Sequence, residues 1–144
     1  MKNPKKTPAE EFEHAERNLG ETRFAVQNGY VSMGVRTLYY ALFHYAKALI
    51  HDTGLYTSSH KQTGIQFRKL FVKERKVSGE VSDLFDELFD ARQQADYGYF
   101  VDLTEEDMES YIRQVDAFGD ITARLLGFER LDRLNKTGKY DGEV

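Results

Sequence analysis

The sequence contains no cysteine, no tryptophan and only two prolines among its 144 residues. The absence of cysteine excludes disulfides, thiolate zinc sites and cysteine nucleophiles, and it fits a reducing compartment. Pro4 and Pro8 both precede the first segment with helical periodicity. No proline therefore interrupts a helix in the rest of the chain.

Long hydrophobic runs are also missing. No apolar stretch approaches the ~20 residues that a membrane-spanning helix needs, and the N-terminal sequence MKNPKKTPAEEFEH lacks the apolar core of a signal peptide. We therefore expect a cytoplasmic protein that does not bind membranes. The net charge of −4 gives no overall attraction to nucleic acid, so such binding would need a local cluster of cations.

The short motifs of several common enzyme classes are absent as well. The sequence has no phosphate-binding loop, no G-x-G-x-x-G, no H-E-x-x-H and no G-x-S-x-G. His44 and His51 lie two helical turns apart, but no further ligand is spaced to join them in a metal site. We expect a partly buried, hydrogen-bonded His44 and a solvent-facing His51, and we predict no metal ion and no cofactor.

Hydrophobic periodicity predicts an all-α bundle of five helices. Hydroxyl caps and glycines place these helices at about residues 8–28, 31–52, 60–76, 79–96 and 105–126. The second helix is apolar around most of its circumference, which is typical of a central helix. We assign residues 1–6 to an N-terminal tail, 7–127 to the bundle and 128–144 to a polar C-terminal tail that we expect to be frayed.

One local excess of positive charge lies at residues 68–76. On a continuous helix these cations would share one broad face and could bind phosphates. The alternative is a solvated face that complements the helix dipole and pairs with the acidic residues of the next helix. The candidate residues for RNA or nucleotide binding are His60, Lys61, Lys69, Lys73 and Lys76.

A second candidate site lies at the end of the fourth predicted helix. Arg92, Asp96 and Tyr99 are spaced by four and three residues, so a helix would bring them to one side. The Arg92–Asp96 pair could simply brace the helix end. Alternatively, the guanidinium could hold a phosphate while Asp96 orients it or accepts a proton. Composition alone does not choose between these interpretations.

Several short patterns follow one another along the chain. They are R-x-x-YYA-x-FH at 36–44, glycine at 54, SHK at 59–61, F-x3-FV at 67–72 and R-x-x-ADY at 92–97. In this order and spacing the series resembles the HEPN family (higher eukaryotes and prokaryotes nucleotide-binding), in particular its small stand-alone prokaryotic branch. The resemblance covers about residues 9–126 and implies an up-and-down bundle of about five helices that forms a symmetric homodimer.

The resemblance also implies roles for individual residues. In catalytic members of the family, an R-x4-6-H motif in a cleft between two protomers cleaves RNA without a metal ion. Arg92 occupies the position of the arginine, whereas Tyr97 stands where the histidine is expected. A phenol with a pKa near 10 is a poor general base at neutral pH. In toxin–antitoxin members the motif ends in a tyrosine that a partner minimal nucleotidyltransferase modifies, and Tyr99 occupies that place.

Three functions are therefore under consideration. The leading hypothesis is a homodimeric protein that binds RNA or nucleotides in a toxin–antitoxin or stress-response pair with a minimal nucleotidyltransferase. The first alternative is a metal-independent endoribonuclease, in which Arg92 steadies the scissile phosphate and Asp96, Tyr97 or the paired protomer's His60 transfers protons. The second alternative is a non-catalytic helical subunit that uses its aromatic residues to bind another protein.

Overall fold

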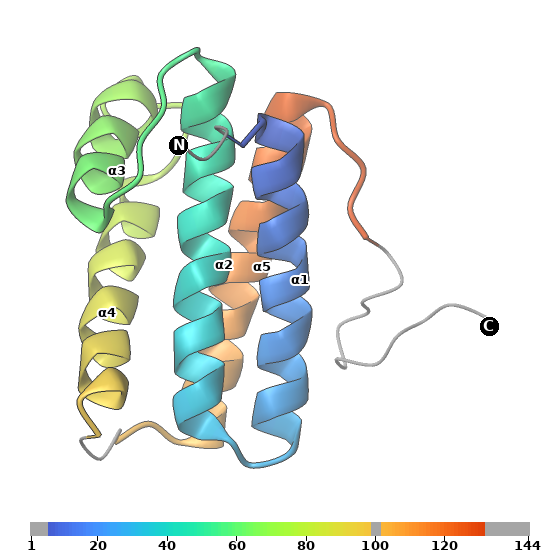
Figure 1. The fold of residues 1–144 in the computed structure, drawn as a ribbon, viewed down its shortest axis with the longest axis vertical. Helices are drawn as coiled ribbons and strands as arrows, with labels where there is room; N and C mark the ends of the chain where they lie inside the picture. Colours follow the sequence, from blue (N-terminus) through green and yellow to red (C-terminus); the bar gives the residue numbers. More distant parts are fainter. Residues whose placement is uncertain (1–5, 99–101, 132–144) are drawn as a thin grey trace, which may run out of the picture.

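The computed structural model describes residues 6–98 and 102–131, and these form an all-α bundle, as the sequence predicts. The elements are α1 (Pro8–Gln27), α2 (Val31–Asp52), α3 (His60–Phe67), the π-helical turn η1 (Arg68–Val72), α4 (Gly79–Asp96) and α5 (Glu105–Leu126). The long helices α1, α2, α4 and α5 run in alternating directions, which is the up-and-down arrangement (Figure 1). None of the described helices combines the length and hydrophobicity that a bilayer crossing requires.

Side-chain caps define the starts of α1, α3, α4 and α5. The Thr7 hydroxyl accepts a hydrogen bond from the Glu10 N–H, and the Glu10 carboxylate accepts one from the Thr7 N–H. Thr104 and Asp107 repeat this reciprocal capping box at the start of α5. Each box satisfies two backbone donors that have no partner within the helix. These local signals explain why the predicted helix starts agree with the structure.

The central element is α2, as predicted. Fourteen of its 22 residues are buried, and it contacts α1, α4 and α5. Figure 1 shows α2 between α1 and α4, with α5 behind α1 and α2. A helix surrounded on three sides must be apolar around most of its circumference, which accounts for its composition. One consequence is that polar side chains on α2 lie next to residues from several other helices.

The third helix is shorter than predicted. The regular helix ends at Phe67, and in η1 the backbone widens, so that the Lys73 N–H donates to the carbonyl of Arg68 five residues earlier. The widened turn keeps Phe67 and Phe71 buried, with their rings stacked 5.8 Å apart. The prediction of one helix over residues 60–76 is therefore wrong, and the chain after Val72 continues in turns.

The chain beyond α5 also differs from the expectation of a frayed tail. Phe128 packs edge-to-face against Phe12 at 5.3 Å, and Arg130 forms ion pairs with carboxylates of α1 and α5. These pairs join Arg130 to Glu16 at 2.9 Å, Asp116 at 2.9 Å and Asp120 at 2.7 Å. Phe128 to Leu131 is thus packed against the bundle, while the rest of the predicted tail, residues 132–144, lies outside the described residues.

Candidate functional site

Arg92 lies where α4 packs against α2, with only 20% of its side chain exposed. Its guanidinium carbon is 5.1 Å from the centroid of the Tyr39 ring, 5.6 Å from that of Tyr40 and 5.3 Å from that of Phe89. Guanidinium groups are attracted to aromatic faces at these distances. These three rings therefore hold Arg92 in a defined position. We call the three rings the aromatic cage.

The part of the chain that the structure describes uses few of the donors of Arg92. Its Nη1 donates to the Tyr40 hydroxyl at 2.9 Å, and the same nitrogen is 3.4 Å from Asp96 Oδ2. Its Nε is buried, and no atom of the described residues accepts a hydrogen bond from it. An arginine carries five N–H donors, and those of Arg92 Nη2 have no partner among the described residues, so this part of the guanidinium retains capacity for an anionic ligand.

Asp96, in the last turn of α4, contacts a second arginine. Its Oδ1 accepts a hydrogen bond from Arg36 Nε of α2 at 2.8 Å. Asp96 therefore lies between Arg36 and Arg92. The predicted proximity of Arg92 and Asp96 is confirmed by their ion pair, whereas the participation of Arg36 was not predicted. Two arginines and one carboxylate leave one formal positive charge at this point of the surface.

His60, at the start of α3, lies beside the aromatic cage. Its ring stacks on Phe89 at 3.6 Å and on Phe85 at 4.6 Å, and its Nδ1 shares a 2.8 Å hydrogen bond with the Tyr39 hydroxyl. Burial lowers the pKa of His60 below its ordinary value; the negative charge of Asp86 opposes this shift, and the positive charges of Arg68 and Arg92 add to it. Burial also raises the pKa of Tyr39, which keeps its hydroxyl protonated. His60 and Arg92 thus contact the same phenylalanine, Phe89.

Of the two tyrosines in the sequence motif, the structure describes Tyr97 but not Tyr99. Tyr97 is the C-cap of α4, and 73% of its surface is exposed. It therefore stands at the accessible end of the helix that carries Arg92. Tyr99, the predicted modification site, lies outside the described residues.

The predicted basic cluster is not brought to Arg92. Lys69, Lys73 and Lys76 are exposed in and after η1, so the expectation that a regular helix aligns them on one face is wrong. The neighbouring Arg68 donates to Ser82 at 2.5 Å and to Asp86 at 2.8 Å, which fixes this segment to the first half of α4. At about 1.5 Å per residue, Arg92 lies further towards the other end of that helix. Lys61 is exposed next to His60.

A buried ionic cluster between α1 and α2 accounts for two other histidines. Glu11 is 1% exposed and lies 2.6 Å from His44 Nδ1 and 3.3 Å from Lys47 Nζ. Burial alone would raise the pKa of Glu11, but the hydrogen bond from His44 and the charge of Lys47 lower it. His51 is 5% exposed, with Nδ1 3.1 Å from the carbonyl of Lys6, so the expectation that it faces solvent is wrong. The described residues contain no group of three or more acidic, histidine or cysteine side chains arranged to hold a metal ion.

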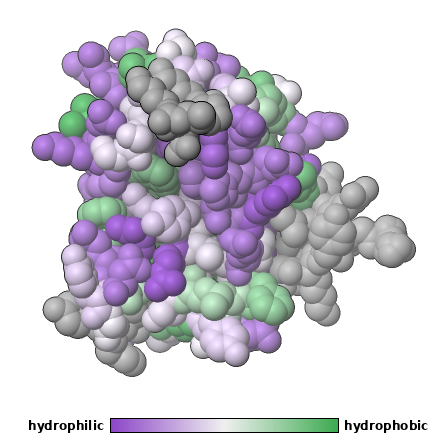
Figure 2. All heavy atoms as spheres, in the orientation of Figure 1, coloured by the Kyte–Doolittle hydropathy of each residue, from purple (hydrophilic) through white to green (hydrophobic). Residues whose placement is uncertain are grey.

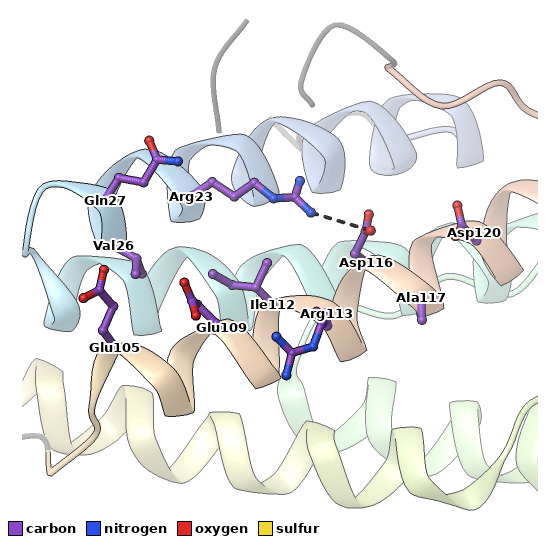
Figure 3. A pocket seen from close by; sticks show the side chains of 10 residues that line it. All are labelled: Arg23, Val26, Gln27, Glu105, Glu109, Ile112, Arg113, Asp116, Ala117 and Asp120. Atoms are coloured by element: carbon purple, nitrogen blue, oxygen red, sulfur yellow. Dashed lines mark ion pairs between the residues drawn. The ribbon is translucent and has the colours of Figure 1, made fainter. Parts of the chain in front are cut away.

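A groove of about 550 Å³ lies on another face, between α1 and α5 (Figure 3). Its apolar floor includes Val26 and Ile112, and the buried Arg23 points along it towards Asp116 at 3.6 Å. The remaining lining residues are Gln27, Glu105, Glu109, Arg113, Ala117 and Asp120. Because acidic side chains outnumber basic ones, the groove is a poorer candidate for binding phosphate than the Arg92 site.

The sequence indicated Arg92, Asp96 and His60 but did not identify their partners on α2. Arg36, Tyr39 and Tyr40 belong to the R-x-x-YYA pattern, which places them on adjacent turns without saying what they contact. The contacts with Arg92 and Asp96 join residues that are more than 50 positions apart. Periodicity within one helix cannot reveal such pairs.

Comparison with known proteins gives one family over most of the chain. A model of the HEPN domain matches residues 9–125. A UPF0332 protein from Thermotoga maritima is 32% identical over 108 residues, covering 75% of this chain and 82% of the relative. Two proteins of Methanocaldococcus jannaschii that are named putative toxins are also similar. One is 25% identical over a region that covers 90% of this chain and 78% of the relative. The other is 32% identical over a region that covers 76% of this chain and 81% of the relative.

Proposed function

This chain belongs to the HEPN domain family, and from that membership we propose that it is a toxin-like protein that binds RNA or nucleotides at the Arg92 site. The likeness to two proteins named as toxins supports the toxin-like role. The observation that carries the proposed binding is the position of Arg92. Three aromatic rings fix a guanidinium whose Nη2 has no partner among the described residues, next to a second arginine on the surface. Such a fork of donors suits the oxygens of a phosphate group.

We further propose that two copies associate so that their Arg92 sites face a shared cleft. Phe24 and Met33 are 60% and 50% exposed, although both are large and apolar. Figure 2 shows hydrophobic surface over the lower parts of α1 and α2, where these residues lie. Met33 and Tyr40 are seven residues apart on α2, which places the apolar patch on the same side as the Arg92 site. An exposed patch of this kind is typical of an interaction surface.

The biological setting that we propose is a toxin–antitoxin or stress-response pair with a minimal nucleotidyltransferase. In that setting the partner enzyme would transfer a nucleotide to Tyr99, close to the Arg92 site in sequence. Lys61, Lys69, Lys73 and Lys76 would contact phosphates further along a bound RNA, since they are exposed on α3 and the segment after it. Mass spectrometry of the chain after incubation with the partner and a nucleotide would show whether Tyr99 carries the added mass.

Sedimentation equilibrium, with and without a short labelled single-stranded RNA, tests the dimer and the binding together. We expect the mass of two chains at micromolar protein concentration, because the exposed apolar patch is covered in the dimer. We also expect RNA to sediment with that dimer at low salt. The mass of a single chain would contradict the shared cleft. A dimer that does not carry RNA would contradict the proposed binding.

A second candidate function is metal-independent cleavage of RNA, and the position of His60 favours it. The His60 imidazole and the Arg92 guanidinium both contact the Phe89 ring. A group that could transfer a proton therefore lies near a group that could bind a phosphate. Burial lowers the pKa of His60 and so favours the neutral imidazole, which is the form that accepts a proton. In this arrangement His60 would transfer the proton in place of the motif histidine, which is Tyr97 in this chain.

A further inference from the structure

The contact between Asp96 and its two arginines would allow another anion to replace the Asp96 carboxylate. Asp96 Oδ1 lies 2.8 Å from Arg36 Nε, and its Oδ2 lies 3.4 Å from Arg92 Nη1. One carboxylate therefore serves two guanidinium groups that come from different helices. The Asp96 side chain is 36% exposed and that of Arg36 is 48% exposed, so water and solutes reach both. Ion pairs at such exposure contribute little to folding.

The two arginines have donors left over. Within the described residues, Arg36 has hydrogen bonds or ion pairs only with Asp96, and Arg92 adds to that carboxylate only the Tyr40 hydroxyl. A phosphate group carries more oxygen acceptors than a carboxylate and can engage two guanidinium groups at once. A phosphate placed between Arg36 and Arg92 would satisfy donors that Asp96 leaves unused.

We propose that Arg36 is a second phosphate-binding residue of this site, and that Asp96 is its resident counter-ion, which a phosphate group of the RNA or nucleotide displaces. This inference rests on the proposed function, because it names how that site takes its ligand. The aromatic cage holds Arg92 in place during the exchange, while Asp96, in the last turn of α4, turns away to solvent. Arg36 then contacts the phosphate in place of the carboxylate.

Fluorescence anisotropy with a short labelled single-stranded RNA tests this exchange. We expect Arg36→Ala to weaken binding about tenfold, since a charged bidentate contact is lost. We expect Asp96→Asn to strengthen binding about threefold, because the competing negative charge is removed. The control is Arg113→Ala, since Arg113 is an exposed arginine that lines the groove between α1 and α5, away from the proposed RNA contacts. That variant should bind within twofold of the unaltered protein.

The two substitutions separate ligand binding from a structural role. If the Arg36–Asp96 pair only braced the helices, Asp96→Asn would weaken binding or leave it unchanged, and either result would overturn the inference. Equal losses in Arg36→Ala and Arg113→Ala would also overturn it. Thermal melting of each variant checks folding, and Arg36→Lys, which keeps the charge, should bind at an intermediate level. RNA binding that depends on Arg92 but not on Arg36 would refute this inference and leave the proposed function standing.

Discussion

Replacement of Arg92 by lysine is expected to weaken RNA binding between about tenfold and a hundredfold while leaving the fold intact. Lysine keeps the positive charge and most of the aliphatic stem, but it loses the planar fork of donors. Hydrogen bonds that involve a charged group contribute about 1.5–3 kcal/mol, which corresponds to that loss of affinity. Titration of a labelled single-stranded RNA at one fixed salt concentration measures the effect.

Lysine is a better substitution than alanine because Arg92 is not an exposed ion-pairing residue. An exposed ion pair contributes only about 0–1 kcal/mol to folding, so removing one would leave the melting temperature nearly unchanged. The Arg92 side chain is 20% exposed and packs against three aromatic rings, so truncation would also remove packing. Arg113→Lys, in the groove between α1 and α5, is the control and should bind RNA as the unaltered protein does. Equal affinities for Arg92→Lys and this control would contradict the proposed binding site.

The second large effect is expected from Tyr97→His, which restores the histidine of the R-x4-6-H motif. We predict that this variant cleaves RNA about a hundredfold faster than the unaltered chain, with a chelator present throughout. An imidazole with a pKa near 6.5 exchanges protons at neutral pH, and positioned general acid–base groups accelerate reactions by roughly 10²–10⁴-fold. Because Tyr97 is 73% exposed, the substitution should not disturb the core. Separation of labelled RNA fragments over time measures the rate.

Tyr97→Phe is the control for this prediction, because it removes the hydroxyl without adding a base. It should cleave RNA no faster than the unaltered protein. If Tyr97→His binds RNA normally but gains no cleavage, the position is not close to the scissile phosphate. Loss of residual cleavage in His60→Ala would then assign proton transfer to His60.

The sequence was most informative where structure depends on neighbouring residues. The capping boxes at Thr7 and Thr104 and the glycine at position 127 determine helix ends through bonds within a few residues. Such signals can be read directly from the chain. The continuous apolar surface of α2 likewise predicted a central helix.

The errors arose where contacts between distant elements decide the outcome. The π-helical turn after Phe67 depends on burying two phenylalanines against other helices, and no local pattern encodes it. Arg130 lies in a polar segment that resembles a disordered tail, yet it contacts Glu16 more than 100 residues earlier. The Arg36–Asp96 contact is of the same kind. Tertiary pairing therefore explains both the misjudged tail and the missed arginine.

Ultraviolet cross-linking of the protein to RNA, followed by mass spectrometry of the peptides, shows directly whether RNA binds at the Arg92 site. We predict cross-links at Tyr40 of α2 and Phe89 of α4, because a phosphate held by Arg92 brings the RNA next to these two rings. These cross-links should disappear in Arg92→Lys. Cross-links confined to the segment around Lys69–Lys76, or to the groove between α1 and α5, would contradict binding at the Arg92 site.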